Sequence, residues 1–395
     1  LTRAGAELIS SKSKEEIFLR QLLKFQLPSP YHKPTDKAAD FWVKPYLEMF
    51  RLIRHFGSLK FDEVRLFCLQ LTDYRDFDRI VHKINDFRKK KARHKGQYKK
   101  FFRDSLTAEL QHIYSDRIKS GKTKTRETKD ASLDTFLRTQ ASNLRDYTDA
   151  FFRYLRATGL VNISHVGRSI EIAPERMEEV DYFLEKIDRD PVFINDPQGY
   201  ANYLENPKLP HLLTDDRHFL MDKLQREFPD VQIHPAYSLP FLKKTLAEML
   251  EKRKEKILSE QVIAIKDYQQ FEEINSTFDQ ILNKSLYDIP LMLEWNTWRA
   301  MTMLDGGRVI ANLKFDDYGN PMSTAQGNIA DIVCDYGQFA LAVEVTMQTG
   351  QRQYEMEGEP VSRHLAKLKR ESKKDAYCLF IAPLIIEACI SHFFA

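Results

Sequence analysis

The chain has 395 residues, with 60 Lys or Arg, 57 Asp or Glu and a formal net charge of +3, and this length allows two or three domains with hydrophobic cores. Four cysteines occur, at positions 68, 334, 378 and 389, without the paired spacing of a zinc site and without a signal-peptide pattern. These features argue against a disulfide-stabilised secreted protein and favour a reducing cytoplasm.

Both ends of the chain predict that further sequence lies beyond them. The first residue is Leu1 rather than Met, and residues 1–8 resemble the exit from a strand into a helix, while residues 390–395 are apolar and uncapped. The apolar stretch 377–395 is interrupted by a proline, a glutamate and a histidine. These interruptions favour a buried strand followed by a core helix over a membrane span.

Residues 39–103 form the first predicted subdomain, because their apolar residues recur at helical spacing. Positive charge is concentrated at its end. Positions 81–130 contain 16 Lys or Arg and 6 Asp or Glu, a balance of +10, so the rest of the chain carries −7. A surface that contacts phosphates requires such a concentration, although lysine runs are also common on solvated helices.

A second basic cluster, 119–126, lies in a glycine-containing loop that we expect to order on a phosphate backbone. A helix or helix pair over 135–157 and two strands, 160–164 and 169–173, follow it. A helix before a small hairpin is typical of a winged helix, whose arginines reach guanine edges, although ordinary surface arginines would show the same pattern. The candidate DNA-binding residues are Arg88, Lys89, Lys90, Lys91, Arg93, Lys95, Lys99, Lys100, Lys122, Lys124, Arg126, Arg138, Arg145 and Arg153.

The middle of the chain predicts a domain boundary and a connector. Residues 191–210 are rich in turn residues, and residues 241–282 predict long helices with many charges. Such helices can hold a C-terminal domain at a fixed offset from a recognition module, or they can form a dimerisation surface. We therefore predict a DNA-recognition region over 1–205, a helical linker over 206–285 and a catalytic domain over 286–395.

The catalytic domain is predicted from a hairpin. Residues 332–336 and 339–346 alternate in character around Gly337-Gln338, a two-residue turn. If the strands pair directly across this turn, paired positions sum to 675 and Asp331 lies opposite Glu344. Shifting the turn by one residue would keep Glu344 on the same face, because side chains alternate with period two.

Two facing carboxylates repel one another unless a cation or a proton lies between them. Ala340 and Ala342 on the same face are expected to leave room for a ligand. Oxygen ligands suit Mg²⁺, which takes one or two carboxylates, waters and substrate phosphate, and hydrolysis of a phosphodiester is the natural reaction. An acidic, half-exposed hairpin without a metal would show the same pattern, so its surroundings must decide.

Two other segments add acids. Glu294 lies in an apolar helix predicted from about 287 to 304, where it is either a costly buried acid or a solvated helix residue. Three glutamates at 355–359 precede a helix that is predicted to begin at Pro360 and to carry His364.

Together these segments resemble the AlwI-like restriction endonucleases, which comprise Type IIS enzymes and related strand-specific nicking enzymes. The resemblance rests on LEW at 293–295, GNIAD at 327–331, VEVT at 343–346, MEGEPVSRH at 356–364 and YCLFIAP at 377–383, with weaker likeness at 18–26 and 206–210. It implies a multidomain α+β protein with a mainly helical, winged-helix-like recognition region and a C-terminal α/β nuclease core of the PD-(D/E)xK type. It also implies a prokaryotic cytoplasm.

The resemblance further implies a set of site residues. These are Asp331, Glu344, Glu357, Glu294 and His364 as catalytic residues, and Asp331, Glu344 and Val345 as the Mg²⁺-binding residues. Two positions depart from the family motif, since Ala330 stands in place of proline and Thr346 in place of lysine. Without that lysine, Glu357 or His364 must help to orient or deprotonate the attacking water.

The resulting hypothesis is a Type IIS-like, Mg²⁺-dependent endonuclease that binds a short asymmetric sequence in double-stranded DNA and cuts outside it. A small nuclease subunit or a transient homodimer is the expected protein partner. Two alternatives stay open. One is a strand-specific nicking enzyme, the large subunit of a heterodimer, and the other is a non-catalytic winged-helix DNA-binding regulator.

Overall fold

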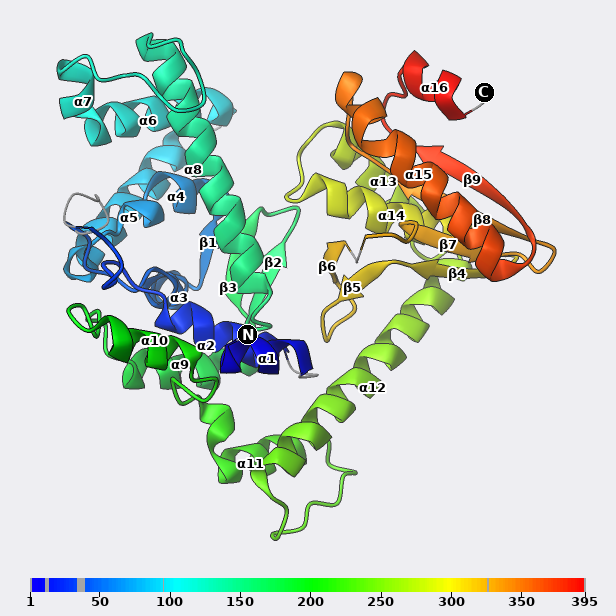
Figure 1. Cartoon of the computed structure of the whole chain (residues 1–395), viewed down its shortest axis with the longest axis horizontal. Helices are drawn as coiled ribbons and strands as arrows, with labels where there is room; N and C mark the ends of the chain where they lie inside the picture. The colour runs from blue at the N-terminus through cyan, green and yellow to red at the C-terminus, as the bar shows by residue number, and fades with distance from the viewer. Residues whose placement is uncertain (1, 11–13, 34–39, 95, 325–326, 394–395) are drawn as a thin grey trace. The chain divides into compact units, whose positions relative to one another are not determined.

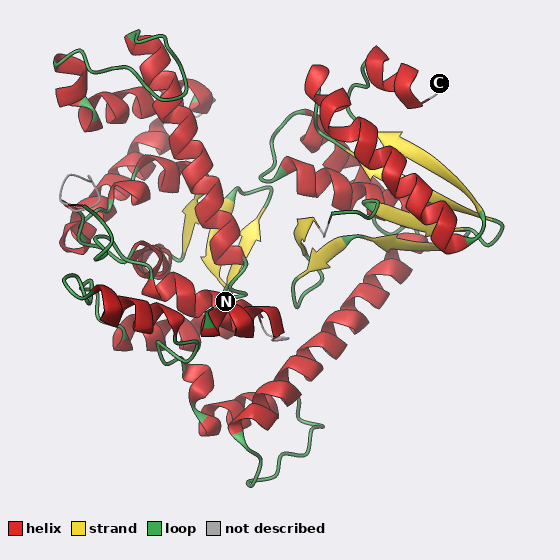
Figure 2. Cartoon of the chain, viewed as in Figure 1, coloured by secondary structure: helices red, strands yellow, loops and turns green. Residues whose placement is uncertain are grey.

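The computed structural model describes the chain except for a few short segments. The described residues are 2–10, 14–33, 40–94, 96–324 and 327–393. They form two compact units, of which the N-terminal unit comprises residues 1–164 and 168–243 and the C-terminal unit residues 165–167 and 244–395. Both units combine helices with small sheets (Figure 1, Figure 2), which confirms the predicted mixed α+β class. None of the described helices is both long and apolar enough to cross a membrane.

The N-terminal unit is mainly helical. Its helices are α1 (Arg3–Ser10), α2 (Lys14–Lys24), α3 (Pro45–Phe56), α4 (Phe61–Leu66), α5 (Phe77–Arg93), α6 (Tyr98–Ile113), α7 (Ser115–Lys119), α8 (Leu133–Arg156), α9 (Met177–Lys186), α10 (Pro197–Glu205) and α11 (Arg217–Glu227). Its strands are β1 (Ser58–Lys60), β2 (Val161–Ser164) and β3 (Ser169–Ile172). They form an antiparallel sheet in the order β1-β3-β2.

Local sequence explains the ends of the main elements in this unit. Helix α3 begins with Pro45, whose missing N–H is not needed in a first turn. Helix α8 begins after Ser132, whose hydroxyl accepts a hydrogen bond from the Thr135 N–H at 3.3 Å. The predicted helix or helix pair is thus a single helix, and the predicted hairpin is confirmed as β2 and β3.

The C-terminal unit contains most of α12 (Leu239–Lys266), which begins in the N-terminal unit. Its other helices are α13 (Phe271–Leu282), α14 (Ile289–Leu304), α15 (Gln351–Ser372) and α16 (Glu387–Phe393). Its strands are β4 (Arg308–Ala311), β5 (Leu313–Phe315), β6 (Pro321–Thr324), β7 (Ile332–Asp335), β8 (Phe339–Val345) and β9 (Asp375–Ile381). The larger sheet has the order β4-β7-β8-β9, with β8 and β9 parallel and the other neighbours antiparallel.

Both faces of the larger sheet are covered by helices (Figure 1). On the face predicted to be apolar, Ile332, Cys334 and Val343 are buried in one core with residues of α13 and α14. Helix α15 packs on β8 and β9 from the other face. Ala340 and Ala342 on that face are buried, and small side chains there let α15 pack closely. That they leave room for a ligand stays a prediction.

Two other predicted elements differ in the structure. Helix α15 begins at Gln351, so Pro360 lies inside it and not at its start. Burial of Gly358 and Val361 anchors both sides of the proline, and this packing offsets the hydrogen bond that proline removes. Strand β9 was expected to be buried, but it is the last strand of its sheet and Tyr377 is 56 % exposed. An edge strand has one neighbour, so less of it is covered.

Candidate active site

The pairing of β7 with β8 brings two carboxylates to one end of the hairpin. Cys334 lies opposite Leu341 and Asp335 opposite Ala340, so the predicted register is confirmed. Continuing it by one pair places Asp331 opposite Glu344. The turn relies on Gly337, which has φ +83°, a conformation that costs other residues strain.

Asp331 is fixed by the backbone on both sides. Its carboxylate Oδ2 accepts a hydrogen bond from the Val345 N–H at 2.8 Å, and its carbonyl accepts one from the Asn312 N–H at 2.8 Å. Val345, which follows Glu344 in the sequence, thus contacts Asp331 through its main-chain N–H. This arrangement holds Asp331 at a defined distance from β8.

The other predicted acids come from the two covering helices. Glu294 lies in the middle of α14 and is 9 % exposed, and its Oε2 atom has no hydrogen-bond partner among the described residues. Glu357 lies in the second turn of α15 and is half-buried. Of the two options left open for Glu294, the structure therefore selects the buried one.

Electrostatics show that these acids form one cluster. Burial raises the pKa of Glu294 to about 9, and four neighbouring carboxylates increase the shift by repulsion: Asp331, Asp288, Glu344 and Glu357. Burial also raises the pKa of Glu344 to about 8, with repulsion from Asp331 and Glu357. For Asp331 burial raises the pKa to about 6, although the Val345 N–H opposes the shift. None of Asp331, Glu344 and Glu294 forms an ion pair with a described Lys or Arg.

His364 from α15 is the one side chain that contacts these buried acids directly within the described chain. Its Nδ1 lies 2.8 Å from Glu344 Oε1, while its Nε2 is buried without a hydrogen-bond partner. Burial and the charge of Arg363 lower the pKa of His364. Burial thus disfavours the charged form of both groups, since it raises the pKa of Glu344 and lowers that of His364.

The structure also places two residues near the site that sequence analysis missed. Arg363 and Lys367, on either side of His364 along α15, contact Asn328 in the segment that leads to Asp331. The Lys367 Nζ atom donates to the Asn328 carbonyl at 3.1 Å, and Asn328 has φ +74°. The available signal was Lys367, which lies three residues after His364 and four after Arg363, because residues three and four apart share a helix face.

The two departures from the motif have structural counterparts. Ala330, in place of proline, is buried. Thr346, in place of lysine, continues β8 beyond its last residue: its N–H donates to the Ile381 carbonyl at 3.0 Å, and its hydroxyl accepts from the Gln348 N–H at 3.0 Å. Its side chain therefore supports the backbone.

The donor chemistry of the site fits a hard divalent cation. Asp331, Glu344 and Glu294 supply oxygen donors only, and the mutual repulsion and the orphaned Glu294 oxygen would both be relieved by a cation. No three Asp, Glu, His or Cys side chains of the described residues are placed to share one ion. Mg²⁺ needs only one or two protein carboxylates, since waters and phosphate oxygens complete its shell.

The predicted basic residues lie on several elements of the N-terminal unit. Arg88 is half-buried and engaged, because it donates two hydrogen bonds to Glu63 and one to the Ser58 carbonyl. Lys91 is also half-buried, with its Nζ 4.4 Å from the centre of the Tyr98 ring. Lys95 lies outside the described residues. The exposed members are Lys89, Lys90, Arg93, Lys99, Lys100, Lys122, Lys124, Arg126, Arg138, Arg145 and Arg153.

Three arginines of α8 are exposed, and each has an acid nearby on the same helix. Arg138 pairs with Asp134, and Arg153 pairs with Asp149 at 2.9 Å. Arg145 lies 3.8 Å from the next residue, Asp146. Exposed pairs of this kind are weak, so the guanidinium groups can exchange partners.

Comparison with known proteins agrees with the sequence resemblance. No curated protein sequence matches the chain. A solved structure, the small subunit (R.BspD6I2) of the heterodimeric restriction endonuclease R.BspD6I, is 29 % identical over 31 % of this chain, with a TM-score of 0.29, and the match spans 64 % of that subunit. The family model of the AlwI restriction endonuclease matches residues 1–395. The chain therefore belongs to the AlwI restriction endonuclease family.

Proposed function

We propose that the chain is a Mg²⁺-dependent, site-specific DNA endonuclease of the Type IIS kind, with a nuclease core of the PD-(D/E)xK type. The observation that carries this proposal is the facing pair Asp331 and Glu344, which is buried, has no Lys or Arg partner among the described residues and is joined by Glu294 and Glu357. Family membership adds the class of reaction, hydrolysis of a DNA phosphodiester.

In this proposal each residue of the site has a role. Asp331 and Glu344, with Val345 beside them, hold the ion, which when bound supplies charge neutralisation and a more acidic water. His364 orients Glu344 through the 2.8 Å contact, and its unpartnered Nε2 is free to accept a proton. Glu357 is the further candidate for orienting the attacking water, since Thr346 cannot replace the motif lysine.

We also propose that the N-terminal unit binds double-stranded DNA as a winged helix. The support is the order of elements: β1 after α3, then α4, and after the inserted helices α5 to α7 the helix α8, directly before the β2-β3 hairpin. All three strands lie in one antiparallel sheet. In a winged helix the helix before the hairpin enters the major groove. Helix α8 is then the reading helix, and the exposed lysines of α5 and α6 contact phosphates.

The proposal includes a division of labour along the chain. Recognition is assigned to 1–205, a helical linker to 206–285 and cleavage to 286–395, so that cuts fall outside the bound sequence. A small nuclease subunit or a transient homodimer would supply the cut in the second strand.

The test is cleavage of supercoiled plasmid by the full chain in Mg²⁺, with Asp331→Ala and Glu344→Ala as site variants. Glu355→Gln is the matched control, because Glu355 is an exposed acid of the same helix α15. We expect discrete Mg²⁺-dependent products from the parent and the control only, and DNA binding in Ca²⁺ by all four proteins. Nicked circles would assign a strand-specific enzyme, and linear DNA a double-strand cutter. DNA binding without cleavage on any substrate would overturn the nuclease and favour a regulator.

A further inference from the structure

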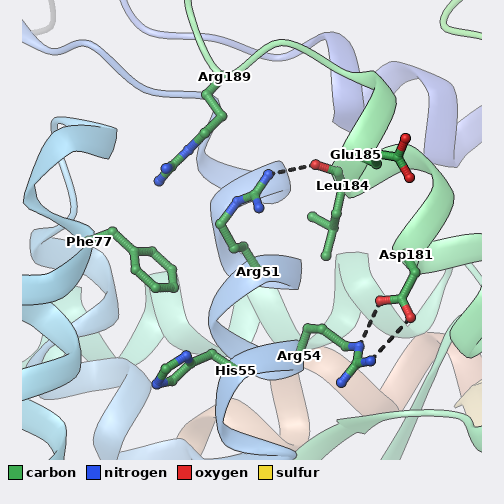
Figure 3. Close-up of a pocket in the computed structure, with 8 residues that line it drawn as sticks. All are labelled: Arg51, Arg54, His55, Phe77, Asp181, Leu184, Glu185 and Arg189. Atoms are coloured by element: carbon green, nitrogen blue, oxygen red, sulfur yellow. Dashed lines mark hydrogen bonds and ion pairs between the residues drawn. The ribbon is translucent and has the colours of Figure 1, made fainter.

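A pocket in the N-terminal unit lies among residues that the proposed cleavage reaction does not use. It has a volume of about 730 Å³ and opens to solvent between α3, α9 and the start of α5 (Figure 3). This size is in the range of small-ligand sites. The lining residues used below are Arg51, Arg54, His55, Asp181, Glu185 and Arg189.

Most charges of the pocket are paired. Arg54 donates two hydrogen bonds to Asp181, from Nε at 2.7 Å and from Nη2 at 3.1 Å. Arg189 donates two to the buried Glu48, at 2.8 and 2.7 Å. Glu185, which is exposed, contacts the ammonium group of Lys186 at 2.9 Å outside the pocket.

Arg51 is left without a full partner. Its Nη2 donates to the Leu184 carbonyl at 2.8 Å, but its Nε is buried and has no hydrogen-bond partner among the described residues. The closest carboxylate, Glu48, is 3.9 Å away and already accepts from Arg189. Burial and the charge of Arg189 lower the pKa of Arg51 despite Glu48. Two guanidinium groups thus share one carboxylate, so Arg51, Arg189 and Glu48 together carry a net charge of +1.

The missing counter-charge defines the ligand chemistry. Arg189 already uses its Nε and Nη2 on Glu48 and the Tyr74 carbonyl, and Arg51 uses its Nη2 on the Leu184 carbonyl. Within the described residues, the Nη1 group of each guanidinium is left for a ligand, and a group with several anionic oxygens can accept from both at once. His55, which lines the same pocket, can add a further donor. Arg189 is held rigidly for this task, since its guanidinium also stacks 4.6 Å above the Tyr74 ring.

We infer that this pocket binds a phosphoryl group, held by Arg51 and Arg189. The group belongs either to a free phosphorylated molecule or to the backbone of bound DNA. The chemistry of both is the same, and the site is separate from the acidic cluster of the C-terminal unit. The inference is independent of the cleavage reaction.

Titration of the full chain with inorganic phosphate, and with pyrophosphate, tests this inference. Chloride at equal ionic strength is the blank, and isothermal titration calorimetry and the melting temperature are the readouts. We expect saturable binding that Arg51→Gln weakens by about tenfold or more, because a charge-assisted hydrogen bond is lost. Arg226→Gln, an exposed arginine of the adjacent helix α11, should bind as the parent does.

A variant that is expected to bind phosphate more tightly tests the inference even if Arg51→Gln misfolds. Removing the exposed carboxylate in Glu185→Gln should tighten phosphate binding by about twofold to threefold, since it removes one repulsive charge. The absence of saturable binding, equal binding by a folded Arg51→Gln protein, or no gain in Glu185→Gln would each overturn the inference.

A duplex oligonucleotide separates the two sources. If the pocket holds a DNA phosphate, free phosphate competes with DNA and Arg51→Gln weakens DNA binding in an anisotropy assay. If it holds a free phosphorylated molecule, Arg51→Gln loses phosphate binding and keeps its affinity for DNA.

Discussion

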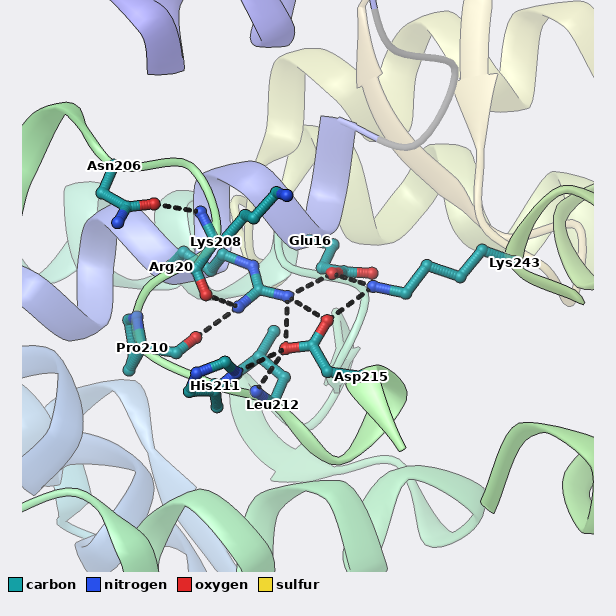
Figure 4. Close-up of polar contacts among 9 residues, drawn as sticks. All are labelled: Glu16, Arg20, Asn206, Lys208, Pro210, His211, Leu212, Asp215 and Lys243. Carbon is teal, nitrogen blue, oxygen red and sulfur yellow. Dashed lines mark hydrogen bonds and ion pairs between the residues drawn. The ribbon is translucent and has the colours of Figure 1, made fainter. Parts of the chain in front are cut away.

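Two clusters of partly or fully buried acids in this protein have opposite electrostatic states. In the N-terminal unit, Glu16 and Asp215 surround Arg20, which is 2 % exposed, and Lys243 completes the group at the start of α12 (Figure 4). Arg20 lies 2.9 Å from both Asp215 oxygens, and Lys243 lies 2.6 Å from Glu16. The charges balance, so we call this set the neutral cluster. Among the described residues, Asp331, Glu344 and Glu294 have no such Lys or Arg partner.

The pKa values record the same contrast. Burial alone would raise the pKa of Asp215, but hydrogen bonds from the Leu212 N–H and Lys243 and the charge of Arg20 lower it instead. At the candidate active site nothing reverses the effect of burial, so the pKa of Glu294 reaches about 9. A buried acid without a cation partner destabilises the fold, and such sites are retained where function requires them.

The largest expected effect concerns cleavage. Asp331→Asn should slow DNA cleavage by about a thousandfold or more, because loss of one ion-binding carboxylate removes several kcal/mol of transition-state stabilisation. Asp215→Asn in the neutral cluster should leave the cleavage rate of the folded protein unchanged. Single-turnover plasmid cleavage compares the two, and equal losses would contradict a functional difference between the clusters.

The next effect concerns the stability of the neutral cluster. Arg20→Met should destabilise the protein by about 3 kcal/mol, because it leaves Glu16 and Asp215 partly buried with only Lys243 as a partner. Urea unfolding measures the change. Arg79→Met, which breaks an exposed pair with Asp76, should cost less than about 1 kcal/mol. Similar losses of unfolding free energy in both variants would show that burial does not strengthen the ion pairs of the neutral cluster.

The opposite sign is expected at the active site. Glu294→Gln should stabilise the metal-free protein by about 1 to 2 kcal/mol at pH 8, because the amide removes a buried acid whose ionisation is opposed. The same variant should lose cleavage activity. Thermal unfolding in EDTA measures the gain, with Glu355→Gln as the exposed control, and a drop in melting temperature for Glu294→Gln would argue against strain at this acid.

The pH dependence of stability follows from the same shifts. The pKa of Glu294 rises from 4.5 unfolded to about 9 folded, so its contribution is fully present below pH 4.5 and is lost as pH rises toward 9. Asp215, with a lowered pKa, contributes above 3.8 and loses this contribution as pH falls through its folded value. Unfolding series in EDTA should show the gain from Glu294→Gln growing from pH 5 to pH 9. A constant gain would contradict this assignment.

The smallest effect on stability is expected at the exposed pairs of α8. Arg138→Ala should change stability by less than about 0.5 kcal/mol, since its pair with Asp134 is fully exposed to screening. If α8 contacts DNA, the variant should weaken DNA binding. The slope of log K against log salt concentration should fall by the amount expected for about one phosphate contact. An unchanged salt slope would exclude Arg138 from the interface.

The sequence by itself determined the hairpin. The sequence pattern and the Gly337 turn predict the face of the sheet on which each side chain lies, because side chains alternate with period two. The pairing of Asp331 opposite Glu344 was one of two registers that this pattern allowed, and the structure selects it. The helices carrying Glu294 and His364 were also predicted, although the start of α15 was wrongly placed at Pro360.

Only the tertiary structure decided how the other residues meet. Glu294 and Glu357 come from helices on opposite faces of the sheet, and no local pattern states which face of a helix will be buried. The pKa values likewise depend on burial and on charges distant in the sequence, as in the neutral cluster, where Glu16 meets Lys243. The Arg51 pocket was missed for this reason. Its arginines lie on α3 and after α9, and they line one pocket only because the two segments pack together.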